Sequence, residues 1–342
     1  MLTGRACSVA RALEVMGDPW GFLAMRGLFF GQRRFNEIRD HGAIPRKILA
    51  SRLKILVREG VVRRRRYHDR PPRYEFVLTQ KGRDHYLPAI ALMRWGDRWL
   101  SGRGHSPIIL RHRLCGRAFH AITVCSQCRQ EVNIRDVNHR PGPGAGVESR
   151  GKVPRSRRSV SPDIYQRAWP CSIARTLGIV ADRWLFVIMR EACFGVRRFD
   201  DFHRATGIAR NVLADRLQRL VADDMLQTKR YHRRPERFEY RLSKKGRDLF
   251  PAILALLAWG DRWAAGRRGP PLIVTHRTCG RDFFPLVVCS QCREPIAVHD
   301  VTYQLNPAVF SKGDRNAPTW SPVHFAGPND PGRASRPGSL RA

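Results

Sequence analysis

The apolar residues of this chain follow helical and strand spacings that occur twice in the same order, at a constant offset of 164 positions from Cys7 to Cys171. Near the start of each half, apolar side chains recur three or four positions apart, the spacing of one face of an α-helix. These stripes are Val9, Leu13 and Met16, then Ile173, Leu177 and Val180. Solenoid repeats are about 20–50 residues long, so a repeat of this length indicates a duplicated domain.

Each copy continues with two predicted helices joined by a turn that contains Gly42 or Gly207. The second helix has leucines on one side. They are Leu49, Leu53 and Leu56 in copy 1, and Leu213, Leu217 and Leu220 in copy 2. A helix, a glycine-containing turn and a helix are the order of a helix-turn-helix motif.

The next segment alternates between apolar and polar residues, which predicts strands. A basic, proline-containing turn precedes each alternating run, so we expect a two-stranded wing with its apolar side chains in the core. These side chains are Tyr74, Phe76 and Leu78, with Phe238, Tyr240 and Leu242 as their twins. Thr79 and Ser243 are then expected to cap one long helix that ends in the repeated WGDRW sequence.

The predicted fold class is α+β and mainly helical, with two tandem winged helix-turn-helix domains, each followed by a small Cys/His module. The segment between the copies is rich in Gly, Pro, Arg and Ser, which predicts a flexible linker. The expected divisions are winged domains at 1–102 and 162–266, Cys/His modules at 103–138 and 267–305, a basic linker at 139–161 and a disordered tail at 306–342.

The net charge of the chain gives information about its binding partners rather than about its fold. The 63 Lys and Arg residues outnumber the 29 Asp and Glu residues, a formal net charge of +34. Such an imbalance favours nucleic acid, an anionic membrane surface or an acidic protein as the partner. The sequence shows neither an apolar run long enough to span a bilayer nor a signal peptide, so we expect a cytoplasmic protein with no membrane partner.

Six of the nine cysteines form two sets with C-x9-C-x2-C spacing, each preceded by a histidine. Three thiolates and one imidazole suit a closed, tetrahedral Zn²⁺ site, so we expect one structural zinc per module. A reduced thiol cluster or a C-x-x-C redox pair is the alternative. The expected ligands are His112, Cys115, Cys125 and Cys128 in module 1, and His276, Cys279, Cys289 and Cys292 in module 2.

Four motifs recur in both copies: C-x-x-A-R-x-L at Cys7, G-x-R-R-F ending at Phe35, KGRD at Lys81 and WGDRW at Trp95. Together they resemble the HxlR-type transcriptional regulators, which are bacterial winged helix-turn-helix proteins related to the MarR group. The resemblance implies DNA-binding dimers, many of which respond to electrophiles, oxidants or small ligands. It makes Cys7 and Cys171 possible redox switches, although packing as small hydrophobic residues is the alternative.

A recognition helix reaches base edges with its N-terminal residues, while basic wing residues neutralise phosphates. We expect this division of labour here, with solvated surface charges as the alternative for any single residue. In the recognition helices the candidates are Arg46, Lys47, Ser51, Arg52, Arg210, Asn211 and Arg216. In the wings they are Arg63, Arg64, Arg65, Arg66, Arg70, Arg73, Lys229, Arg230, Arg233, Arg234 and Arg237.

The predicted function is sequence-specific binding of double-stranded DNA by a nucleoid-associated transcriptional regulator. The alternative is a zinc-ribbon RNA-binding or ribosome-associated protein, which the charge alone also favours. An enzyme is not expected, because we find no catalytic triad, phosphate-binding glycine loop or open metal site. The two copies are expected to pair within one chain, as a pseudo-dimer, or between two chains, as a homodimer; a small-molecule effector is possible.

Overall fold

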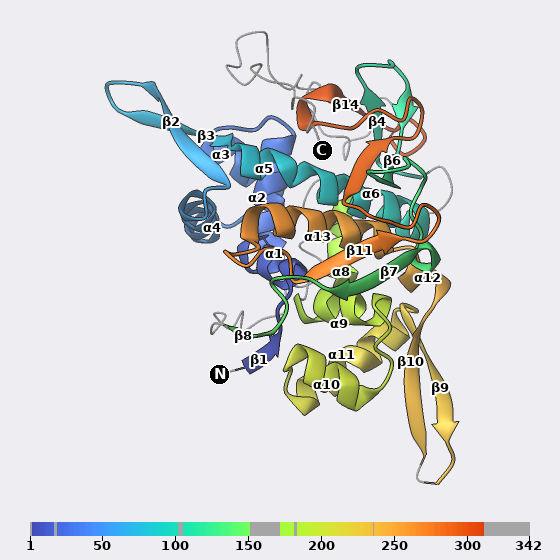
Figure 1. Ribbon diagram of the computed structural model, residues 1–342. Coiled ribbons are helices and arrows are strands. Elements are labelled where there is room, and N and C mark those ends of the chain that lie inside the picture. Colours follow the sequence, from blue (N-terminus) through green and yellow to red (C-terminus); the bar gives the residue numbers. More distant parts are fainter. Residues whose placement is uncertain are drawn as a thin grey trace.

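The computed structural model describes residues 2–16, 19–101, 105–150, 172–180, 183–234 and 236–310. Each copy forms a winged helix-turn-helix domain flanked by one helix before it and one long helix after it (Figure 1). In copy 1 the elements are α1 (Ser8–Met16), α2 (Pro19–Phe29), α3 (Phe35–Gly42), α4 (Arg46–Arg58), β2 (Val62–His68), β3 (Arg73–Leu78), α5 (Gln80–Asp84) and α6 (Tyr86–Leu100). In copy 2 they are α8 (Ser172–Val180), α9 (Arg183–Cys193), α10 (Phe199–Thr206), α11 (Arg210–Ala222), β9 (Leu226–His232), β10 (Arg237–Leu242), α12 (Lys244–Arg247) and α13 (Phe250–Ala264).

In both copies, a residue with a left-handed backbone conformation forms the turn before the second helix of the motif, between α3 and α4 in copy 1 and between α10 and α11 in copy 2. Ala43 has φ 48°, and Gly207 has φ 68° at the corresponding turn in copy 2. The leucine stripe of α4 and α11 faces inward, as the spacing predicts, and every leucine in it is buried. Its burial orients each helix so that its opposite face is left exposed.

The helix expected to begin after Thr79 is interrupted. The Thr79 hydroxyl accepts a hydrogen bond from the Gly82 N–H and so caps the short helix α5, and α6 begins only at Tyr86. The close approach of α5 to Val61, the residue before β2, explains the glycine, because a Cβ at Gly82 would lie 2.2 Å from the Val61 carbonyl oxygen. Copy 2 repeats this arrangement with a Ser243 cap.

The wings are the antiparallel hairpins β2–β3 and β9–β10, which project from opposite ends of the molecule (Figure 1). The expectation that all their apolar residues lie in the core is wrong at the outer end. Tyr74 and Phe238 are 41% and 43% exposed, because they lie on the part of the hairpin beyond the domain body. Nearer the body, Phe76 and Tyr240 are partly buried against the core.

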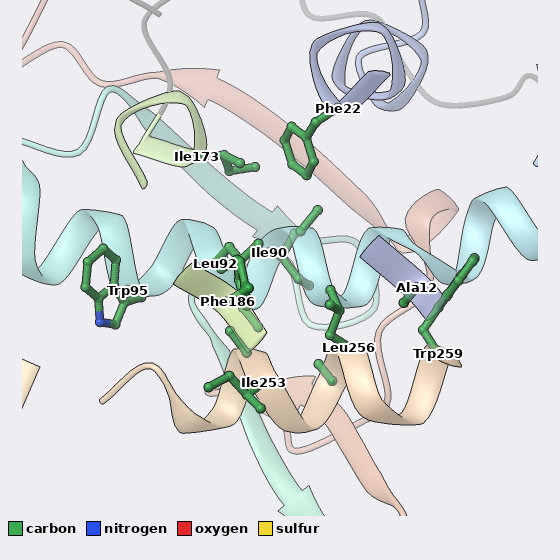
Figure 2. Packing of buried hydrophobic residues seen from close by; sticks show 14 of the residues in the cluster. Ala12, Phe22, Ile90, Leu92, Trp95, Ile173, Phe186, Ile253, Leu256 and Trp259 are labelled. Atoms are coloured by element: carbon green, nitrogen blue, oxygen red, sulfur yellow. The ribbon is translucent and has the colours of Figure 1, made fainter. Parts of the chain in front are cut away.

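The two copies share one hydrophobic core in which helices from both are interleaved. α1 of copy 1 packs on α13 of copy 2, α8 of copy 2 packs on α6 of copy 1, and α6 lies against α13. Figure 2 shows the apolar side chains that fill this region, with Trp95 and Trp259 at opposite ends of the α6–α13 pair. The copies thus pack against each other within one chain, which is one of the two arrangements that the sequence predicts.

The WGDRW sequence forms several of the polar contacts between the copies. The Trp95 indole N–H donates to the Lys245 carbonyl oxygen at 3.0 Å, and the Trp259 N–H donates to the Lys81 carbonyl oxygen at 2.9 Å. In the same way, the second tryptophan and the arginine of each motif contact an aspartate of the other copy. These contacts are Trp99 and Arg98 to Asp248, and Trp263 and Arg262 to Asp84.

The glycine and the aspartate of the motif receive the first helix of the opposite copy. A Cβ at Gly260 would lie 2.2 Å from the Ser8 carbonyl oxygen, so only glycine permits this contact between α13 and α1. Next to it, the Ser8 hydroxyl donates to Asp261, and the Ser172 hydroxyl donates to Asp97 in the twin contact.

The two Cys/His modules are built from strands that pair across the copies. β4 of copy 1 pairs with β14 of copy 2, β7 pairs with β11, and β6 pairs with β13, all antiparallel. The modules expected at 103–138 and 267–305 are thus one intertwined body, because each supplies the strand partners of the other. The strands are β4 (Ile108–His112), β5 (Ala118–Phe119), β6 (Ala121–Cys125), β7 (Val137–Pro141), β11 (Leu272–His276), β12 (Arg281–Asp282), β13 (Pro285–Cys289) and β14 (Val301–Leu305).

The first part of the expected flexible linker is ordered. Residues 139–141 complete β7, and β8 (Val147–Arg150) pairs with β1 (Leu2–Arg5) at the start of the chain. Composition alone missed this because the strand partners lie more than a hundred residues away in the sequence. The rest of the linker, 151–161, lies outside the described residues, as does 311–342 of the expected tail. At the start of that tail, Asn306 is buried and donates from Nδ2 to the Ser106 carbonyl oxygen at 2.8 Å.

None of the helices in the described segments is long and apolar enough to cross a membrane.

Candidate nucleic-acid interface and metal centres

The N-terminal residues of both recognition helices are exposed. Arg46 and Lys47 begin α4, and Arg210 and Asn211 occupy the same positions on α11. Neither helix has an acidic residue in its first turn, so the positive end of each helix dipole adds to these side chains.

Aromatic rings on the preceding helix hold the two leading arginines. The Arg46 guanidinium lies 5.6 Å from the centroid of the Phe35 ring, and Arg210 lies 5.8 Å from that of Phe199. Arg210 also pairs with Asp200 at 3.0 Å, so the charge at this position is partly neutralised in copy 2.

The remaining candidates on these helices differ in exposure. Ser51 is exposed, whereas Arg52 and Arg216 are partly buried. Arg216 pairs with the adjacent Asp215. This ion pair partly neutralises the charge of Arg216.

The wing of copy 1 divides into paired and unpaired arginines. Arg65 pairs with Glu75 at 2.5 Å, and Arg66 pairs with Asp69 at 3.0 Å. The Arg64 guanidinium stacks 4.1 Å from the centroid of the Tyr74 ring. The others are exposed and pair with no acid among the residues that the structure describes; these are Arg63, Arg70 and Arg73.

The wing of copy 2 has a similar division but starts with fewer charges. Arg230 pairs with Glu236 at 2.9 Å. Within the described ranges, the other predicted residues are exposed and form no ion pair: Lys229, Arg233, Arg234 and Arg237. Gln227 and Thr228 occupy the positions of Arg63 and Arg64.

Sequence reasoning passed over one arginine in each copy that lies between wing and helix. The Arg34 guanidinium stands 5.0 Å from the centroid of the Tyr67 ring, and Arg198 stands 4.7 Å from that of Tyr231. Both arginines are the N-caps of the helices before the recognition helices. Their repetition in the G-x-R-R-F motif was the available signal.

The eight predicted metal ligands form two clusters, each containing one histidine and three cysteines. In each cluster the candidate ligand atoms all lie within 4.8 Å of one another, a spacing suited to one metal ion. The histidines and one cysteine of each set are buried, and the other two cysteines are partly buried. The clusters are His112, Cys115, Cys289 and Cys292, then Cys125, Cys128, His276 and Cys279.

The expected grouping of one complete ligand set per module is wrong. Each cluster takes its H-x2-C pair from one copy and its C-x2-C pair from the other. The physical reason is the strand pairing, because β4 and β11 end next to strands of the opposite copy rather than next to their own knuckles.

The thiols within a cluster have unlike environments. A hydrogen bond from the Arg117 backbone lowers the pKa of Cys115, and the Arg281 backbone does the same for the pKa of Cys279. Burial raises the pKa of Cys125.

The structure describes one of the two candidate redox cysteines. Cys7 is fully buried at the start of α1, where its sulfur accepts a hydrogen bond from the Ala10 N–H at 3.4 Å. Its burial suits the packing role. Cys171 lies outside the described residues.

Two winged domains with exposed recognition helices, joined through their flanking helices, define a winged helix-turn-helix protein. The chain belongs to the HxlR-like helix-turn-helix family, whose model matches residues 15–103 and 179–267, one segment in each copy. It is thereby placed among the helix-turn-helix transcriptional regulators.

Relatives of the chain have the same description. An uncharacterized HTH-type transcriptional regulator of Mycobacterium tuberculosis is 43% identical over 150 residues, which cover 44% of this chain and 95% of the relative. Another from Synechocystis is 36% identical over 101 residues, covering 29% of this chain and 73% of the relative. The mycobacterial protein is therefore about as long as one copy.

Among solved structures, a Pseudomonas aeruginosa protein proposed to be a transcription factor is 39% identical, with a TM-score of 0.25. The match covers 32% of this chain and 73% of that protein.

Proposed function

We propose that this protein regulates transcription by binding double-stranded DNA through its two winged helices, with one recognition helix in the major groove of each half-site. The observation that carries the proposal is the presence of two exposed recognition helices on a single body with an interleaved core. A helix-turn-helix dimer binds two half-sites because it has two such helices at a defined separation. Here one chain supplies both.

The two half-sites are proposed to differ in sequence. Copy 1 presents Pro45-Arg46-Lys47 where copy 2 presents Ala209-Arg210-Asn211. Arginine and lysine favour guanine, whereas asparagine favours adenine. A homodimer must read two identical half-sites, but this chain is free to read an asymmetric operator.

The wings and the arginines beside them are proposed to contact phosphates. The exposed, unpaired arginines of the wing tips are free to neutralise the backbone, and Arg34 and Arg198 are held by their tyrosines beside the same surface. These contacts supply affinity without base specificity.

Selection of bound sequences from a random duplex pool tests this function. We expect an enriched site with two unlike half-sites about one helical turn apart or a multiple of it. The paired substitutions Arg46→Ala and Lys47→Ala should relax the selected sequence in one half-site only, and Arg210→Ala with Asn211→Ala should relax the other. Failure to enrich any duplex sequence would overturn the proposal.

Besides the net charge, one structural observation favours the RNA-binding alternative, the exposed wing residues Tyr67, Tyr74, Tyr231 and Phe238. Proteins that bind unpaired RNA bases stack them on such rings. Three of the four rings are already covered by arginines of the protein itself, since Arg34, Arg64 and Arg198 stack on them. Competition by single-stranded RNA in the same binding assay distinguishes the two functions.

We assign zinc to the two clusters, in a structural role. Three sulfurs and one imidazole nitrogen match the preference of Zn²⁺. Four protein ligands leave no coordination position for a reacting water, which agrees with a family of regulators rather than enzymes.

A DNA-binding regulator of this kind acts at the nucleoid in the cytoplasm. Its response to a small-molecule effector is a prediction from the family resemblance.

A further inference from the structure

We propose that each zinc ion is bound by both copies at once, so that the two ions fasten the copies to each other. This proposal rests on the assignment of zinc to the two clusters. A structural zinc within one module would stabilise only that module. A zinc shared by the two copies would also link the copies.

The distances between ligand atoms fit a tetrahedral ion that spans the copies. A Zn–S bond of about 2.3 Å places two tetrahedral sulfur ligands about 3.8 Å apart. Across the copies, Cys115 Sγ lies 4.0 Å from Cys289 Sγ, and Cys125 Sγ lies 3.9 Å from Cys279 Sγ. These separations already correspond to edges of the coordination tetrahedron.

The imidazole nitrogens are placed in the same way. The Nδ1 atom of His112 lies 3.2 Å from Cys292 Sγ of the other copy and 3.7 Å from Cys115 Sγ of its own. In the second cluster the Nδ1 atom of His276 lies 3.2 Å from Cys128 Sγ and 3.6 Å from Cys279 Sγ. Each histidine nitrogen thus lies closer to a sulfur of the opposite copy than to the sulfur of its own H-x2-C pair.

Backbone pairing delivers each half of a ligand set. His112 is the last residue of β4 and faces Val301 of β14, while His276 ends β11 and faces Val137 of β7. The two C-x2-C knuckles follow β6 and β13, which pair with each other. Binding converts three thiols to thiolates and releases their three protons as Zn²⁺ enters.

The fastened strands contact the helices that hold the winged domains together. β6 packs on α6 and α13, and β13 packs on α13. Arg94 of α6 donates to the Ala121 carbonyl oxygen of β6 at 2.7 Å. Metal occupancy therefore restrains the α6–α13 pair, and through it the separation of the two recognition helices.

Zinc stoichiometry in paired variants of the full chain separates crossed sites from one site per module. The parent should contain two zinc ions. Cys115→Ser with Cys289→Ser, one change in each module, should lose one ion because both ligands belong to one crossed cluster. Cys115→Ser with Cys125→Ser, both in module 1, should lose both ions. Sites confined to modules predict the reverse for the two pairs, and that result would overturn the proposal.

Thiol protection provides a second measurement that needs only one substitution. In Cys115→Ser, we expect iodoacetamide to modify Cys289 and Cys292 and to spare Cys125 and Cys128, as mapped by mass spectrometry. Modification of Cys125 and Cys128 instead would show sites confined to one module. Cys193→Ala is the matched control, since Cys193 belongs to neither cluster.

A parent protein that contains no zinc after purification in reducing buffer, and takes up neither Zn²⁺ nor Co²⁺, would overturn both the zinc assignment and this proposal. It would leave the DNA-binding function to be judged by sequence selection alone.

Discussion

Individual side chains of the WGDRW sequence explain why the motif recurs unchanged. The Trp95 and Trp259 indoles each donate to a backbone carbonyl of the other copy, and glycine and aspartate at the next two positions receive the opposite first helix. A buried indole N–H requires a partner, so the motif depends on the second copy for its hydrogen bonds. Residues that look like core aromatics in the sequence therefore serve the contact between copies.

Substitution of Gly260 by Ala should destabilise the protein by about 1–3 kcal/mol, the usual cost of overpacking. The new methyl group would lie 2.2 Å from the Ser8 carbonyl oxygen, and backbone must shift to make room. Urea denaturation followed by tryptophan fluorescence measures the loss. Gly27→Ala is the matched control, because its Cβ would meet its nearest neighbour at 3.5 Å. Equal effects of the two substitutions would contradict the packing account.

The aspartates of the motif should make the contact between copies depend on pH. Burial raises the pKa of both Asp97 and Asp261 to about 6, from an ordinary value of 3.8. Between about pH 4 and pH 6, the folded protein holds protons that the unfolded chain has released. The stabilisation from these protonated carboxyls is therefore lost as the pH rises through about 6.

We expect the double variant Asp97→Asn with Asp261→Asn to lack this dependence. On going from pH 5 to pH 7, the free energy of unfolding of the parent should fall relative to that of the variant. His41 and His85 act in the opposite direction, because burial lowers the pKa of each to about 3 and acid favours the unfolded chain. Both proteins retain them, so the difference between the two urea denaturation series isolates the aspartates. Parallel pH profiles would exclude this role.

At the scale of elements, the recognition helices and wings carry the difference between the copies on a common frame. The leucines of α4 and α11 are buried alike, and both wings pair in the same register up to a bulge near the tip. The exposed positions differ between the copies, most of all where Arg63 and Arg64 of copy 1 correspond to Gln227 and Thr228 of copy 2.

Alanine at Arg63 and Arg64 should flatten the salt dependence of DNA binding. Each lost phosphate contact lowers the slope of log K against log salt by about 0.9, so we expect a drop of roughly 2 for the pair if both contact phosphates. Arg65→Ala should change it less, because that charge already pairs with Glu75. Arg58→Ala is a control of the same charge, since Arg58 pairs with Glu59 at the far end of α4. An unchanged slope for the first pair would refute the assignment.

At the scale of the whole molecule, one chain has the construction of an interleaved dimer. Helices α1 and α8 pack on the last helices of the opposite copies, strands pair across the modules, and each Cys/His cluster draws on both. Two binding units on one body gain affinity without new contacts, provided that both engage together. That gain in affinity depends on how rigidly the two copies are held relative to each other.

Removal of the metal should accordingly weaken binding to a site with two half-sites by more than about tenfold, because loss of a fixed geometry forfeits part of the gain from joint engagement. Fluorescence anisotropy before and after chelation, with zinc restored as the reversal, measures the effect. A duplex with a single half-site should respond less. Equal losses on the two duplexes would show that the metal does not set the geometry between copies.

The sequence by itself determined the duplication, the helix-turn-helix order, the leucine stripes and the eight Cys and His residues that form the two clusters. Each of these features follows from the spacing of residues along the chain or from the repeat. Both can be read from the sequence without knowing the fold. The alternation of the wing misled at Tyr74 and Phe238, because a period of two marks a face of a strand but not how far the strand extends beyond the body.

Only the tertiary structure decided which of these Cys and His residues share a cluster, which strands pair and what the ordered part of the linker does. Two copies with the same ligands allow either a closed set within each module or a crossed set, and the spacing along the chain is identical in both cases. The choice depends on contacts between residues more than a hundred positions apart, such as β4 with β14. Those contacts come from packing the two copies together, and no local pattern in either copy encodes them.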